Sequence, residues 1–165
     1  MTRDEIKALI KKVALSEGID EALLLAICTV ESSLNPLAVK FEPAYKWIES
    51  PREWASQIRV KVPGYSVETE EALQRFSYGL GQIMGGVMRQ YGYQGLLQTC
   101  LHDPEISLIY AAKHLRNFLR RYSVEVEAIA AYNAGSPRKT AGGLFLNQTY
   151  VDKVDKELRK LRALV

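Results

Sequence analysis

The sequence predicts a mainly α-helical domain with a central buried helix and little or no sheet. Apolar residues recur at helical spacing in several segments, and most of these segments begin with a capping residue or proline and stop at a glycine. Sustained alternation of apolar and polar residues is absent, so any sheet is expected to be minor. The 165 residues contain no linker, repeat or low-complexity tract, so we expect residues 1–165 to form a single domain.

Two helices are expected at the N-terminal end of the chain. The first begins with a capping box and stops at a glycine, and the second is apolar on every side, which is typical of a central buried helix. The residues that carry these predictions are Thr2 and Glu5 in the capping box, Gly18 at the stop, Asp20 at the second N-cap, and the apolar stretch from Ala22 to Val30, which Glu31 and Ser32 follow.

The rest of the chain is also expected to be helical, apart from an irregular stretch at about residues 40–75 and a glycine-rich turn at 79–86. Inside the irregular stretch, Ser50 to Glu53 form the pattern of an N-cap, a first-turn proline and a capping box. The remaining expected elements are a short helix with Trp54 and Ile58 that ends at Pro63 and Gly64, a weak helix at 66–76, a strong helix from Asp103 and Pro104 to Tyr122, a helix at 124–134 closed by Gly135, and an amphipathic helix at about 149–161.

Composition disfavours several classes of protein. The 22 Lys and Arg residues exceed the 19 Asp and Glu residues by only three, too few to indicate a nucleic-acid partner. Cys28 and Cys100 lack metal-site spacing and are expected to be buried, reduced thiols. No nucleotide- or metal-binding motif is present, so we expect no cofactor and no metal. The apolar runs are too short to predict a membrane anchor, and no secretory signal is visible.

Glu31 is the candidate catalytic residue because it ends a nearly all-apolar helix. Burial disfavours the carboxylate anion, and so does the negative end of the helix dipole, so both effects should raise the pKa of Glu31. A carboxyl group that keeps its proton near neutral pH can serve as a general acid. The alternative is a solvated glutamate that turns outward from the helix end.

Three blocks in order carry a family resemblance: Val30-Glu31-Ser32-Ser33, Gly79-Leu80-Gly81-Gln82-Ile83-Met84 and Ala131-Tyr132-Asn133-Ala134-Gly135. They resemble the blocks of the soluble-type lytic transglycosylases, and the resemblance extends over roughly residues 19–154. It implies a lysozyme-like helical fold and an enzyme that cleaves the β-1,4 bond between N-acetylmuramic acid and N-acetylglucosamine in peptidoglycan. It also implies that Glu31 is the sole acid/base and that the C6 hydroxyl of the sugar attacks, which leaves a 1,6-anhydromuramoyl end.

The resemblance also implies a set of substrate-binding residues. Glycines in the second block would let a flat sugar approach the backbone, and the Gln82 amide would serve an N-acetyl group. Without the resemblance, the glycine block would be an ordinary tight turn, and Tyr132 and Asn133 would belong to a C-terminal helical turn. Tyr150 would be an ordinary residue of the amphipathic helix. The expected substrate-binding residues are Ser32, Gly79, Gln82, Met84, Tyr132, Asn133 and Tyr150.

The chain departs from the family pattern in two places. Residues 32–78 separate Glu31 from the second block, a longer spacing than many members have, which indicates an insertion at about 40–75. Its aromatic residues Tyr45, Trp47 and Trp54 either line a saccharide cleft or pack a small lobe. Gly85-Gly86 replaces the proline that commonly follows the second block, so the resemblance does not predict the backbone conformation there.

Other functions compete with this one. A goose-type lysozyme shares the fold and the glutamate but hydrolyses the bond with additional aspartates; here Glu42 and Asp103 are the possible partners, although Asp103 fits a helix cap better. A cysteine amidase would use Cys28 with His102 or His114. The third alternative is an inactive glycan-binding module.

The expected partners are peptidoglycan glycan strands, bound by a monomer without a membrane anchor. Action at the bacterial cell wall without a visible signal peptide suggests a phage lysis protein, a virion-associated enzyme or a shortened chain.

Overall fold

A computed structural model describes residues 1–62 and 64–163, and it is mainly helical with one small sheet. In chain order, the elements are α1 (Arg3–Glu17), α2 (Glu21–Ser32), β1 (Val39–Phe41), α3 (Pro51–Lys61), α4 (Val67–Leu73), β2 (Phe76–Tyr78), β3 (Ile83–Met84), α5 (Gly85–Gln90), the 3-10 helix η1 (Leu97–Leu101), α6 (Pro104–Arg121), α7 (Glu125–Ala134) and α8 (Gln148–Arg162).

Local signals in the sequence set several of the helix ends. The Thr2–Glu5 capping box is formed, Asp20 caps α2 through the Ala22 amide, and Asp103 caps α6 through the Glu105 amide. Gly18 and Gly135 end α1 and α7 in the left-handed conformation that glycine adopts easily. The helical fold class that the sequence predicted is confirmed.

Two predictions about the irregular stretch need correction. Helix α3 begins at Pro51, but Ser50 has a φ of 47° and its side chain makes no capping hydrogen bond, so the predicted capping box is wrong. The weak helix expected at 66–76 ends at Leu73, and Phe76 already belongs to strand β2. Pro63, expected to end the preceding helix, lies outside the described residues.

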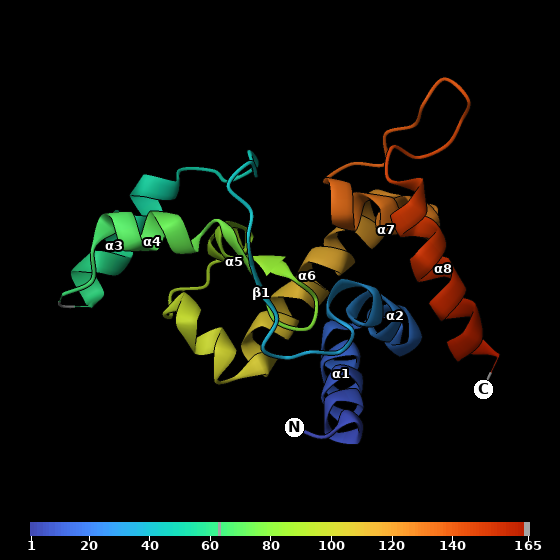
Figure 1. Cartoon of the computed structure of the whole chain (residues 1–165), viewed down its shortest axis with the longest axis horizontal. Coiled ribbons are helices and arrows are strands. Elements are labelled where there is room, and N and C mark those ends of the chain that lie inside the picture. The colour runs from blue at the N-terminus through green and yellow to red at the C-terminus, as the bar shows by residue number, and fades with distance from the viewer. Residues whose placement is uncertain (63, 164–165) are drawn as a thin grey trace.

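The core lies among helices from both ends of the chain. Helix α2 packs against α1 and α8, and α6 packs against α1 and α7 (Figure 1). The interior side chains of α2, from Leu23 to Cys28, are buried apart from half-buried Leu25, in line with the predicted central helix. This packing holds α2 in place, and Glu31 lies in its last turn.

The segment between α2 and α6 is built differently. It contains the antiparallel sheet, in the order β1-β2-β3 with Val39 opposite Tyr78 and Ser77 opposite Met84, and the paired helices α3 and α4 on the left of Figure 1. Within the described residues, no helix is long and apolar enough to span a membrane.

A buried ion pair holds α4 to α5. The Arg89 Nε donates to the Glu70 Oε1 over 2.7 Å, and both side chains are fully buried. The Arg89 Nη1 also donates to the carbonyls of Tyr93 and Gly95 at 2.6 and 2.8 Å. The Glu70 anion is therefore compensated by a cation that is itself fixed in place.

Candidate active site

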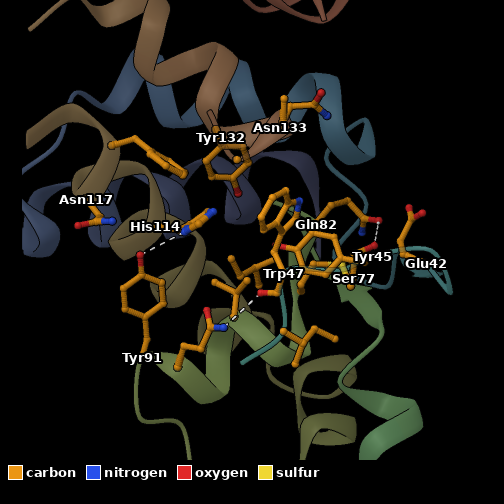
Figure 2. A pocket seen from close by; sticks show the side chains of 18 of the residues that line it. Glu42, Tyr45, Trp47, Ser77, Gln82, Tyr91, His114, Asn117, Tyr132 and Asn133 are labelled. Carbon is orange, nitrogen blue, oxygen red and sulfur yellow. Dashed lines mark hydrogen bonds between the residues drawn. The ribbon is translucent and has the colours of Figure 1, made fainter. Parts of the chain in front are cut away.

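A cavity of about 880 Å³ opens between the end of α2, the sheet, α5, α6 and the end of α7. Figure 2 shows side chains from these elements converging on it. Its volume is in the range of pockets that bind small-molecule ligands. Of the residues predicted from sequence, it brings together Glu31, Gln82, Met84, Tyr132 and Asn133.

Glu31 lies in the last turn of α2, half-buried at the wall of this cavity. Burial raises the pKa of its carboxyl group from 4.5 to about 7; the Tyr150 hydroxyl and the Lys40 cation oppose this rise, and the Glu42 anion adds to it. The ammonium group of Lys40 pairs with Glu42 at 2.6 Å. Glu31 therefore holds a proton close to neutral pH and lines the cavity.

Two tyrosines surround the Glu31 carboxyl. The Tyr132 hydroxyl donates to the Gly81 carbonyl over 2.6 Å, which fixes the ring between α7 and the glycine-rich turn. The Tyr150 hydroxyl is buried and makes no hydrogen bond of normal geometry within the described chain, yet it lies close enough to Glu31 to influence its pKa. Burial, and secondly the Glu31 charge, raises the pKa of both phenols, so both remain protonated.

The glycine-rich turn is fixed by hydrogen bonds within the protein. The Gln82 Nε2 donates to the carbonyls of Ala38 and Gly79 at 3.1 and 3.0 Å, and its Oε1 accepts from the Ser77 hydroxyl at 2.8 Å. The Ser32 hydroxyl donates to the Leu80 carbonyl at 2.8 Å. Ser32 and Gln82 therefore hold the turn beside Glu31, and the Gln82 amide is largely committed to the protein.

Gly79 has a packing reason for lacking a side chain. Its φ is +68°, and a Cβ at this position would lie 2.3 Å from the Ser107 Oγ. Gly79 and Ser32 do not line the cavity, and neither does Tyr150, whereas buried Met84 forms part of its wall. Asn133 is exposed at the cavity, where its Oδ1 accepts from the Asn147 Nδ2 at 3.0 Å.

The aromatic residues of the irregular stretch divide between the two expected roles. Tyr45 and Trp47 line the cavity, whereas Trp54 does not and lies half-buried on α3. Phe41 pairs instead with Phe76, with ring centroids 4.8 Å apart.

One polar face of α6 lines the cavity and was not predicted from the sequence. His114, Asn117 and Arg121 line the cavity and share one face of the helix through their spacing of three and four residues. That spacing was visible in the sequence, but nothing indicated that this face meets the cavity.

The structure gives no support to the cysteine amidase. Cys28 is fully buried, and burial raises the pKa of its thiol far above the ordinary value. His114 shares a hydrogen bond with the Tyr91 hydroxyl instead of the thiol. Asp103 caps α6. The described residues contain no cluster of three His, Cys, Asp or Glu side chains that could hold a metal.

Comparison with known proteins places the chain in a family. Residues 8–143 match the model of the transglycosylase SLT domain. The invasion protein IagB of Salmonella typhimurium and that of Salmonella typhi are each 32% identical over 87 residues, which cover 52% of this chain and 52% of each relative. The chain thus spans about half the length of the curated relatives it matches. No solved structure matches the chain significantly. Since the family model covers most of the chain, the protein belongs to the soluble-type lytic transglycosylases of the SLT domain family.

Proposed function

We propose that the protein is a peptidoglycan lytic transglycosylase that cleaves the β-1,4 bond between N-acetylmuramic acid and N-acetylglucosamine, with Glu31 as its only acid/base. The observation that carries the proposal is Glu31 itself, a half-buried carboxyl group at a large cavity with a pKa raised to about 7. A general acid needs its proton at the working pH, and this environment supplies that condition.

The reaction needs one carboxyl group in two successive roles. The Glu31 acid donates its proton to the glycosidic oxygen as the bond from that oxygen to C1 of the muramic acid breaks. The resulting Glu31 carboxylate then accepts the proton of the C6 hydroxyl as the C6 oxygen bonds to C1. The products are a free hydroxyl on one sugar and a 1,6-anhydro ring on the other, and Glu31 regains its proton. Buried Tyr132 and partly buried Tyr150 lie near the carboxyl and reduce its exposure to solvent.

Hydrolysis is the second candidate, because Glu42 lines the same cavity and acts electrostatically on Glu31. Retaining and inverting glycosidases use two carboxylates. Glu42 is paired with Lys40 in the structure. This pairing favours a role for Glu42 as a charged residue of the cavity wall over a role as nucleophile or base. The acid step of Glu31 is common to both reactions, and only the group that attacks C1 differs.

The experiment that tests the proposal is digestion of purified sacculi followed by mass spectrometry of the muropeptides. The proposal expects 1,6-anhydromuramoyl ends from wild type and from Glu42→Gln. Reducing ends that disappear in Glu42→Gln would support the hydrolase instead. An absence of cleavage in a protein that still binds glycan would support the inactive binding module. The substrate also implies that the protein acts at the bacterial cell wall.

A further inference from the structure

The cavity extends beyond Glu31 to two walls that the acid/base step does not use. One wall is the segment 42–49, which includes Tyr45 and Trp47, and the other is the α6 face with His114 and Asn117. Figure 2 shows Trp47 and Tyr45 on one side of the view and His114 and Asn117 on the other, with Tyr91 below His114 and joined to it by a hydrogen bond.

The 42–49 wall is fixed although it has no regular secondary structure. Ile48 packs on Gly86, where a Cβ would lie 2.7 Å from the Ile48 Cγ2, so the glycine makes room for this contact. The Gln90 Nε2 donates to the Trp47 carbonyl at 3.2 Å, and Tyr45 packs against the core. These contacts hold the backbone of residue 47, while the Trp47 side chain remains largely exposed at 66%. An indole left open on a fixed backbone suits stacking on the apolar face of a sugar.

The α6 wall offers two neutral polar side chains, His114 and Asn117, and one cation, Arg121. The His114 Nδ1 shares a hydrogen bond of 3.2 Å with the Tyr91 hydroxyl, and the ring packs edge-on against Phe118. Burial lowers the pKa of His114 to about 4, so the imidazole is uncharged at neutral pH. Its Nε2 has no hydrogen-bond partner within the described chain and is not among the buried unpartnered atoms, so it is open to the cavity. The exposed Asn117 amide lies one turn further along. The donors and acceptors of His114 and Asn117 are uncharged and suit an uncharged amide, whereas the Arg121 cation lies a further turn along the helix.

We propose that Trp47, His114 and Asn117 form a subsite for one N-acetylated sugar ring, in which the indole stacks on the ring and the α6 groups recognise its acetamido group. The inference rests on the proposed action on an N-acetylated glycan, but it concerns binding and not bond cleavage. Tyr91 is a positioning residue, because its hydroxyl holds the Nδ1 side of His114 and leaves the Nε2 side for the ligand.

Binding is tested in the Glu31→Gln protein, where no turnover is expected, by calorimetric titration with the N-acetylglucosamine tetramer. Cellotetraose is the matched ligand, since it has the same β-1,4 backbone with a hydroxyl in place of each acetamido group. The subsite predicts tighter binding of the N-acetylated tetramer. Trp47→Ala should weaken binding of both ligands about fivefold or more through lost stacking. Asn117→Ala and Tyr91→Phe should mainly reduce the preference for the acetylated ligand, and this selective loss separates recognition from a general structural effect.

Trp54→Ala and Arg120→Ala are the controls, because neither residue lines the cavity. Equal affinity for the two tetramers, or unchanged affinity in folded Trp47→Ala, would overturn the subsite, as would no saturable binding at millimolar ligand. Binding with these preferences in a protein that yields no anhydro ends would leave the subsite intact and overturn only the proposed reaction.

Discussion

Two glutamates, one fully buried and one half-buried, illustrate how one kind of side chain takes two roles in this molecule. Glu70, in the segment between α2 and α6, is fully buried and lies 2.7 Å from an equally buried arginine. Glu31, at the end of a core helix, has no comparable cation, because Lys40 pairs with Glu42 instead. A buried carboxylate with a cation partner holds two helices together, whereas a carboxyl group without such a partner keeps a proton that it can donate. The presence of a buried cation partner distinguishes the structural glutamate from the candidate acid.

Replacement of Glu31 by Gln should have the largest effect on activity. The amide keeps the volume of the side chain but has no proton to transfer, so the rate of sacculus lysis should fall by about 10²-fold or more. Thermal unfolding should show that the variant is folded. Glu21→Gln, at the exposed other end of α2, is the control and should retain wild-type activity. A folded Glu31→Gln protein with a rate within about tenfold of wild type would exclude Glu31 as the acid.

Glu70→Gln should show the opposite behaviour, a large loss of stability without a direct effect on the chemical step. It leaves the Arg89 cation buried without its counter-ion, and breaking such a pair costs about 3–5 kcal/mol in free energy of unfolding. Glu71→Gln is the neighbouring control, because its partner Arg52 is largely exposed and such surface pairs contribute only about 0–1 kcal/mol. Denaturant unfolding measures both variants. Equal stability of the two would show that the buried pair does not hold α4 to α5.

Stability should also depend on pH through Glu31. Its folded pKa of about 7 lies above the ordinary value of 4.5, so the folded state binds more protons than the unfolded state between these values. Stability from this group is therefore fully present below about pH 4.5, falls as the pH rises through 7, and then levels off. Relative to wild type, Glu31→Gln should gain about 3 kcal/mol between pH 4 and 8, a gain that partial solvent exposure would reduce. Parallel stability curves for the two proteins would contradict the raised pKa.

Gly86→Ala should produce a smaller effect on the wall opposite α6. The added methyl group would overlap Ile48, and such overpacking costs about 1–3 kcal/mol or displaces the 45–48 segment. Lower stability or weaker binding of the N-acetylglucosamine tetramer is expected, measured by thermal unfolding and calorimetry. Gly142→Ala is the control, since its nearest neighbour would be 3.8 Å away. A neutral result at Gly86 would mean that Ile48 does not anchor the segment.

The double replacement Cys28→Ala and Cys100→Ala should leave the rate of sacculus lysis unchanged and lower stability by about 1 kcal/mol per site. Both thiols are buried, and burial raises the pKa of Cys100 to about 12. Loss of activity in a folded double variant would support a thiol nucleophile.

Local signals explain how much of the fold was predictable. Caps at Thr2, Asp20 and Asp103 and glycine stops at Gly18 and Gly135 act within a few residues, so they set helix ends that the sequence alone reveals. The strands contain only two or three residues and depend on partners far along the chain, such as Val39 with Tyr78. Periodicity does not reveal elements of that length.

The candidate site divides in the same way. Glu31 was recognisable because a carboxylate in an apolar helix violates its surroundings, and the three sequence blocks marked the turn and the tyrosine beside it. The Glu70–Arg89 pair and the His114–Tyr91 contact were not predicted, because each joins residues whose meeting depends on tertiary packing. The hydrogen bonds of the Gln82 amide to Ser77 and Ala38 were not predicted for the same reason.

The most direct test of the central claim is a carbon-13 NMR titration of the glutamate side-chain carboxyls, with Glu31→Gln used to assign the Glu31 signal. We predict that Glu31 titrates with an apparent pKa of about 7. A pKa near the ordinary 4.5 would contradict the account, because Glu31 would then be an anion at neutral pH and could not donate the proton that starts cleavage.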